Sequence, residues 1–178
     1  MLPQPVLVVG TYNADGIPNA MNAAWAGQWD MKQIMISMGS HATTENLVRN
    51  GDFTVSFATR DTLTAADYVG LVSAKNRPDK IARTGWTYVK ASTVDAPRFE
   101  GFPMTLECRI CKRLDESPTG FYLIADILNI AVDERYIGPD GKPDVAKMGL
   151  ITFDPVNNAY IALGEKAGDA FAAGKALE

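Results

Sequence analysis

Short apolar runs separated by polar turns dominate the chain and predict strands rather than long helices. The run at 5–12 is followed by the turn sequence NADG and by a second strand within 17–27, so we expect a hairpin. Further strands are predicted at 33–38, 52–58, 87–92, 104–114 and 121–133, and two more segments at 150–154 and 159–163.

Helical patterns are confined to two insertions. Residues 39–51 contain a glycine-ended loop and a short helix stopped by Gly51, and residues 62–86 alternate between helix and loop, with Asp79 as a cap after Pro78. So few helices exclude doubly wound crossovers, and six to eight short strands favour a mainly β fold, a closed or nearly closed antiparallel barrel. We expect one domain over 1–178, with 165–178 as a loosely docked helical tail.

Composition and charge narrow the function. The 178 residues are 47% hydrophobic and 21% charged, which is ordinary for one globular domain. A net charge of -4 with scattered Lys and Arg predicts no nucleic-acid partner. No run approaches the roughly 20 apolar residues of a membrane span, and the N-terminus lacks a leader pattern, so we expect a cytoplasmic protein with no membrane partner.

The two cysteines, Cys108 and Cys111, have a C-x-x-C spacing within a predicted strand. The alternation puts Cys108 on one face and Cys111 on the other, so the two thiols cannot share a metal or form a bridge. We expect no metal site, because zinc needs four ligands and the chain has one histidine, His41. Neither a G-x-G-x-x-G nor a G-x-S-x-G motif is present, and no catalytic nucleophile, acid or base is assigned.

Residues 19–30, NAMNAAWAGQWD, combine an amide and a large indole with side chains too small to fill a core. Taken with SMGSHATTENLVRNGDFTVSF, SAKNRPDKIARTGW and FPMTLEC, in this order, the stretch resembles the flavin reductase-like family and its flavoredoxin-type members. The resemblance runs from about Val6 to Val132. It implies a Greek-key split barrel that binds FMN and works as a homodimer, with the flavin near the subunit interface.

The resemblance implies that residues 19–30 line a flavin pocket. A flavin ring is flat, and its pocket needs a few hydrogen-bonding amides set in an apolar wall. Here the small side chains of Ala23 and Ala24 leave room for the ring. Asn22 would then hydrogen-bond the polar edge of the ring, and Trp25 would pack beside it. The alternative is that Trp25 and Trp29 fill the barrel end and Asn22 ends a strand. The family often has Thr or Ser at 22–24, so the ring contacts cannot be copied directly.

Three other segments supply candidate cofactor ligands. A glycine, hydroxyls and a helix start favour an anion such as the FMN phosphate or the ribityl chain, and the candidates here are Ser37, Met38, Gly39, Ser40, His41 and Thr44. The alternative is ordinary capping by Thr43 or Thr44. Lys75 and Lys80 are candidates for binding the same phosphate. Lys80 is preferred, because the resemblance to the family is closest at the Asp79-Lys80 pair. The alternative is that both are solvated lysines on a surface helix. Ser56 and Phe57 are candidates for lining the ring, although Phe57 suits the core equally well.

FMN supplies the redox chemistry in any member of this family, so two functional classes follow from the resemblance. An enzyme would use NADH or NADPH as a transient donor to FMN and pass electrons to free flavin or another acceptor. A carrier would hold FMN tightly and move electrons between redox protein partners. A third possibility is a barrel that binds another small molecule as a sensor or binding module.

Overall fold

The structure is a computed structural model that describes residues 2–117 and 120–177. Its strands are β1 (Gln4–Pro5), β2 (Leu7–Tyr12), β3 (Pro18–Ala23), β4 (Ala26–Asp30), β5 (Gln33–Met38), β6 (Asp52–Phe57), β7 (Tyr88–Lys90), β8 (Pro97–Phe99), β9 (Met104–Ser117), β10 (Gly120–Val132), β11 (Ile151–Asp154) and β12 (Ala159–Ala162). The α-helices are α1 (Ala42–Asn50), α2 (Leu63–Leu71) and α3 (Lys80–Thr84).

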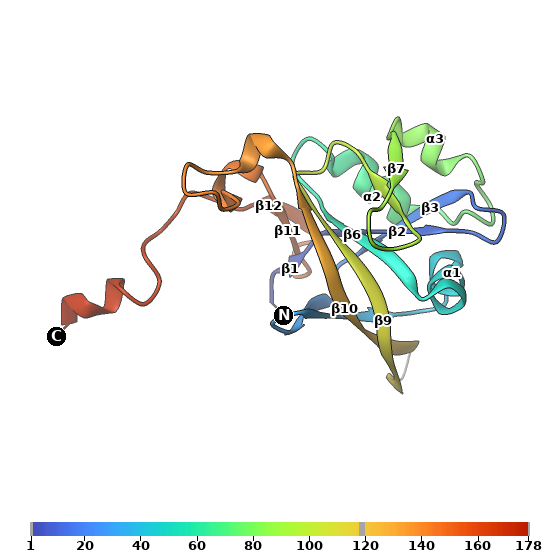
Figure 1. The fold of residues 1–178 in the computed structure, drawn as a ribbon, viewed down its shortest axis with the longest axis horizontal. Coiled ribbons are helices and arrows are strands. Elements are labelled where there is room, and N and C mark those ends of the chain that lie inside the picture. The colour runs from blue at the N-terminus through green and yellow to red at the C-terminus, as the bar shows by residue number, and fades with distance from the viewer. Residues whose placement is uncertain (1, 118–119, 178) are drawn as a thin grey trace.

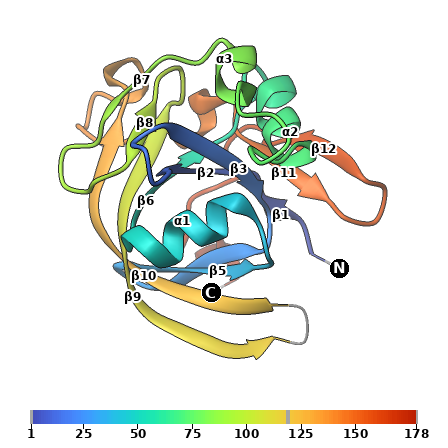
Figure 2. The same cartoon turned by 90° about the vertical axis from the view of Figure 1, so that its right-hand side faces the viewer.

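Seven strands form a curved sheet in the order β3-β2-β6-β9-β10-β5-β4, and every neighbouring pair is antiparallel. The predicted hairpin of β2 and β3 is present, with Thr11 opposite Asn19. The two ends of the sheet, β3 and β4, follow one another in the chain and are joined by Ala24 and Trp25 alone. The sheet therefore curls into a barrel that is split between these two strands (Figure 2).

Alternating side chains fill the inside of the barrel. Along β5, Ile34, Ile36 and Met38 point inward and are buried, as the period of two requires. Helix α1 lies across the barrel and contributes the buried Leu47 to the same core (Figure 2). It ends as predicted at Gly51, whose positive φ of 75° favours glycine.

A smaller sheet forms on the side of the barrel that α2 and α3 cover. Its order is β1-β11-β12, so the predicted segment at 150–154 pairs with the N-terminal strand and the segment at 159–163 pairs with 150–154. The buried side chains Val69, Ile81 and Ile151 join this sheet and both helices in a second core. Strand β8 was not predicted; its three residues pair with β7 and are too few to show a pattern.

The cysteines take the environments that the alternation predicted. Cys108 is fully buried in the barrel core, Cys111 is exposed, and both are free. Glu107, on the opposite face from Cys108, is also fully buried, because the segment after β7 covers it. Ser92 N–H and Thr93 N–H donate hydrogen bonds to its carboxylate at 3.1 and 2.7 Å.

The C-terminal segment extends away from the barrel (Figure 1). Residues 164–177 are exposed throughout and contain one short 3-10 turn, Ala173–Leu177. Among the residues that the structure describes, no helix is long and apolar enough to span a membrane.

Candidate functional site

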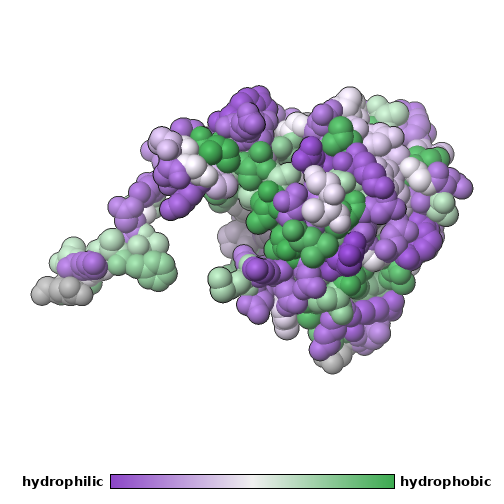
Figure 3. Space-filling model, in the orientation of Figure 1, coloured by the Kyte–Doolittle hydropathy of each residue, from purple (hydrophilic) through white to green (hydrophobic). Residues whose placement is uncertain are grey.

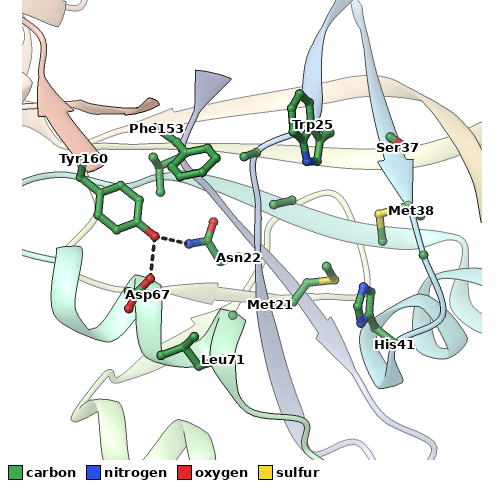
Figure 4. Close-up of a pocket in the computed structure, with 15 residues that line it drawn as sticks. Met21, Asn22, Trp25, Ser37, Met38, His41, Asp67, Leu71, Phe153 and Tyr160 are labelled. Carbon is green, nitrogen blue, oxygen red and sulfur yellow. Dashed lines mark hydrogen bonds between the residues drawn. The ribbon is translucent and has the colours of Figure 1, made fainter. Parts of the chain in front are cut away.

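A cavity of about 400 Å³ opens at the split of the barrel (Figure 4). Residues from β3 and the link after it, from the end of β5, from α2 and from the small sheet surround it. They are Val6, Met21, Asn22, Ala23, Ala24, Trp25, Ser37, Met38, Gly39, His41, Asp67, Gly70, Leu71, Phe153 and Tyr160.

The cavity brings together the two predicted segments that carry the most candidates. One segment contributes Asn22, Ala23, Ala24 and Trp25, and the other contributes Ser37, Met38, Gly39 and His41. They meet because β4 folds back on β5, so that the Ser37 N–H donates to the Trp25 carbonyl at 2.8 Å. Small side chains at 23 and 24 keep the space between them open.

The two tryptophans do not fill the barrel end. Trp25 and Trp29 are 54% and 55% exposed, so the alternative reading of these residues is wrong. Helix α1 and its Leu47 take that place in the core instead.

Sequence reasoning missed the wall of the cavity opposite Trp25. Asp67 of α2 and Tyr160 of β12 lie there, and the Tyr160 hydroxyl donates to Asp67 Oδ1 at 2.6 Å. Asn22 Nδ2 in turn donates to the Tyr160 oxygen at 3.5 Å. Burial, together with the Asp67 carboxylate, raises the pKa of Tyr160 to about 12.

A second cavity of about 320 Å³ adjoins the first and shares Met21, Asn22, His41, Gly70 and Leu71 with it. It lies between the start of α1 and the end of α2, and Ala42, Thr43 and Lys80 line it.

No side chain caps the start of α1. The helix begins at Ala42 after His41, and the His41 side chain makes no capping bond. Capping by Thr43 or Thr44 is wrong, because both lie inside the first turn; Thr43 Oγ1 accepts from Asn19, and Thr44 Oγ1 donates to the Gly39 carbonyl. The first N–H groups of α1 therefore have no side-chain cap from His41, Thr43 or Thr44.

Lys80 is one of the most buried charged residues, with 2% of its surface exposed. Its ammonium donates to the carbonyls of Val69 and Val72 at 3.2 and 3.0 Å, at the end of α2. Burial lowers the pKa of Lys80 to about 8. The reading of Lys80 as a solvated surface lysine is therefore wrong.

The remaining candidates lie elsewhere. Ser40 and Thr44 line a neighbouring cavity of about 610 Å³ together with Arg49 and Arg113. Lys75 is exposed and forms an ion pair with Glu45.

Ser56 and Phe57 belong to the barrel rather than to the cavity. The Ser56 hydroxyl is fully buried and hydrogen-bonds Thr105 Oγ1 at 2.9 Å, and Phe57 packs against the barrel core. This placement favours the core reading of Phe57 and gives Ser56 no access to the cavity.

Residues 1–141 match the family model of the flavin reductase like domain. Among solved structures, flavoredoxin of Desulfovibrio vulgaris (Miyazaki F) is 36% identical with a TM-score of 0.92, covering 98% of this chain and 94% of that chain. Flavoredoxin from Methanosarcina acetivorans is 29% identical with a TM-score of 0.88, over 99% of this chain and 93% of that one.

A split-barrel protein from Shewanella frigidimarina shares the fold, with a TM-score of 0.84 at 16% identity, over 96% of this chain and 87% of that chain. The mainly β split-barrel fold that the sequence predicted is thus confirmed. Among curated proteins, none matches this chain.

Proposed function

The chain belongs to the family of flavin reductase-like domains, and from this premise we propose that it binds FMN and carries electrons through it, as a flavoredoxin-type protein. The observation that carries the proposal is the cavity at the split of the barrel, where the candidate residues of two separate segments meet.

The residues of the two joined cavities fit the two ends of FMN. The first cavity offers apolar surface from Met21, Leu71 and Phe153 beside the polar groups of Asn22 and Ser37, which suits an aromatic ring with a hydrogen-bonding edge. The second offers the uncapped start of α1 and the Lys80 ammonium, which suit a phosphate. Asn22 and His41 line both, so one molecule can reach from one cavity into the other.

FMN, when bound, accepts and releases electrons at its ring. The protein's own contribution would be to hold the ring between Trp25 and the wall of α2, which line the cavity on two sides. Each of Asn22, Ser37 and His41 can donate or accept a hydrogen bond and so orient the ring and its side chain.

The visible absorption spectrum of the purified protein, before and after FMN is added and the sample desalted, tests FMN binding directly. We expect flavin bands that survive the column. A protein that stays colourless after FMN is added would contradict the proposal and favour a binding module for another small molecule.

A second candidate function, NAD(P)H-dependent flavin reduction, is favoured by the neighbouring cavity of about 610 Å³. Arg49 and Arg113 flank it, and it shares Gly39 and His41 with the flavin cavity, so an anionic dinucleotide could bind there next to the ring.

Anaerobic reduction separates the carrier from the enzyme. Rapid bleaching of the bound FMN by NADH or NADPH would support the reductase, with Arg113→Ala expected to weaken the nicotinamide donor's apparent affinity. Bleaching only by a reduced redox protein would support the carrier.

The proposal includes a homodimer. Trp25 and Trp29 are half exposed beside the split, and Met31 of the same region is 88% exposed. Figure 3 shows further hydrophobic surface on the face that β10 crosses, where Leu128 and Ile130 are exposed. Such surfaces are typical of contacts between subunits. Light scattering should give twice the chain mass, and a monomeric mass at working concentration would contradict the dimer.

A further inference from the structure

Three side chains on separate elements form a hydrogen-bonded chain along one wall of the flavin cavity. Asp67 lies on α2, Tyr160 on β12 and Asn22 on β3, and Figure 4 shows the three side chains pointing toward one another. Tyr160 lies beyond residues 1–141, the part of the chain that the family model matches.

The hydrogen bonds that join Asp67, Tyr160 and Asn22 are consistent with only one arrangement of protons. An ionised carboxylate can only accept hydrogen bonds, and a phenol has a single proton, so the Tyr160 proton points to Asp67 at 2.6 Å. The Tyr160 oxygen is then an acceptor for Asn22, and the Asn22 amide has to turn its nitrogen toward it. Its oxygen, Oδ1, faces the other way (Figure 4).

Resting on the proposed FMN binding, we propose that Asp67 and Tyr160 are positioning residues that fix the Asn22 amide so that Oδ1 is the acceptor for the ring imide N–H of a flavin. The pyrimidine edge of an oxidised flavin has one donor, this N–H (N3), among several acceptors. A wall that presents a fixed acceptor selects for a ring that carries a donor at this position.

The Cβ of Asn22 is also held in place, by its contact with α2. A methyl group at Gly70 of α2 would lie 2.9 Å from the Cβ of Asn22, so the helix and this residue are in direct contact. Asn22 is thus fixed at its Cβ by Gly70 and at its amide by Tyr160. The high pKa of Tyr160, about 12, keeps the phenol protonated near neutral pH, which suits a fixed hydrogen bond.

The experiment compares the dissociation constants of FMN and N3-methyl-FMN by fluorescence titration. We expect wild type to bind the methylated flavin about five- to tenfold more weakly, because the methyl group removes the donor and displaces an amide that cannot turn away. In Tyr160→Phe the amide is free to rotate, so this ratio should fall toward one. Tyr68→Phe is the matched control, since Tyr68 is the neighbour of Asp67 but lines a different cavity, and it should keep the wild-type ratio.

A second measurement tests the hydrogen bond between Tyr160 and Asp67 in the absence of flavin. In the apo protein, NMR titration of isotope-labelled tyrosine should show Tyr160 ionising at a lower pH in Asp67→Asn than in wild type, because the negative charge beside the phenol is gone. An unchanged Tyr160 titration would overturn the pairing with Asp67.

The outcomes separate the inference from the function on which it rests. Equal binding of FMN and N3-methyl-FMN by wild type, or an unchanged ratio in Tyr160→Phe, would overturn the inference and leave FMN binding intact. Binding of neither flavin would overturn the proposed function, and the inference with it.

Discussion

Glu107 and Lys80 are both buried charged residues, but only Glu107 has hydrogen bonds that outweigh the effect of burial on its pKa. Burial raises the pKa of Glu107, but hydrogen bonds from Thr93 and Ser92 outweigh it, so the pKa of this carboxyl is lowered and its charge is satisfied. Lys80 has only two carbonyl partners, and burial lowers its pKa to about 8. Lys80 is therefore the buried charge that an incoming anion would stabilise.

The first residue-scale prediction concerns Lys80 and pH. A phosphate binds the protonated form, so the affinity for FMN should be nearly constant between about pH 7 and 8, where the phosphate is a dianion, and should fall by up to about tenfold per pH unit above that range. Riboflavin, which lacks the phosphate, should show no such decline. Titrations between pH 7 and 9 measure both.

Two variants control this experiment. Lys80→Met should lose the pH dependence, whereas Lys75→Met removes an exposed lysine paired with Glu45 and should keep it. A persistent decline in Lys80→Met would assign the effect to another group.

The second residue-scale prediction concerns Gly70→Ala. The new methyl group would lie 2.9 Å from Asn22 Cβ, and the crowding should cost about 1–3 kcal/mol, partly offset by about 1 kcal/mol from the helix propensity of alanine. We therefore expect a net destabilisation of up to about 2 kcal/mol, which lowers the melting temperature by up to about 8 °C, and a fall in FMN affinity of about tenfold because Asn22 is displaced. Gly27→Ala, where the methyl group meets no atom, should leave both unchanged.

The candidate residues that line the cavity are near neighbours in the chain. Asn22 to Trp25 and Ser37 to His41 are two continuous segments, so one local pattern indicates all of their members. Asp67 and Tyr160 carry no such signal, because their hydrogen bond joins positions 93 residues apart. A carboxylate on a helix or a tyrosine on a strand is ordinary until long-range pairing brings the two together.

At the scale of elements, the ion pair of Asp52 and Arg109 connects β6, β9 and the segment before β8. Asp52 at the start of β6 accepts from Arg109 of β9 at 2.7 and 3.0 Å and from the Asp95 N–H at 2.9 Å. The Arg109 hydrogen bond is the main cause that lowers the pKa of Asp52. Because Asp52 is buried while Arg109 is half exposed, we attribute the stabilisation chiefly to satisfying the carboxylate.

Asp52→Asn should lower the free energy of unfolding by about 1–2 kcal/mol at pH 7. The pKa of Asp52 is lower in the folded than in the unfolded state, so its contribution is complete above about pH 4 and is lost as the pH falls further. The difference between variant and wild type should therefore shrink in acid, as urea unfolding at several pH values can show. Asp79→Asn, which removes an exposed pair with Arg83, should change the stability by less than about 0.5 kcal/mol at any pH.

Element types were predictable where local patterns are strong. The strands at 33–38 and 52–58 and the helix before Gly51 have clear periodicity or a glycine stop, and the structure has all three within a residue or two. The partners of the strands were not predictable in the same way. The pairing of β1 with β11 depends on the whole chain having folded, and nothing local in either strand indicates it.

At the scale of the whole molecule, the barrel and the tail differ in how they are held. The barrel strands share one continuous core, whereas residues 164–177 are exposed and extend away from it (Figure 1). Phe171 is fully exposed within this tail and has a positive φ of 60°.

Deletion of residues 165–178 should change the free energy of unfolding by less than about 0.5 kcal/mol, because the described part of this segment, 165–177, is exposed throughout. Thermal unfolding and light scattering of the shortened chain measure stability and assembly together. A large loss of stability, or a change of mass, would show that the tail packs against the barrel or against a second copy.

The Asn22 and Tyr160 contact joins residues 138 positions apart and closes the wall of the flavin cavity. During synthesis the strands beside the split leave the ribosome before β12, so the wall stays incomplete until β12 has emerged. We therefore expect the complete set of cavity contacts to form only after residue 160 has emerged, so that cofactor capture follows the synthesis of β12. A nascent or truncated chain that stops before residue 160 would have most of the barrel and an unfinished pocket.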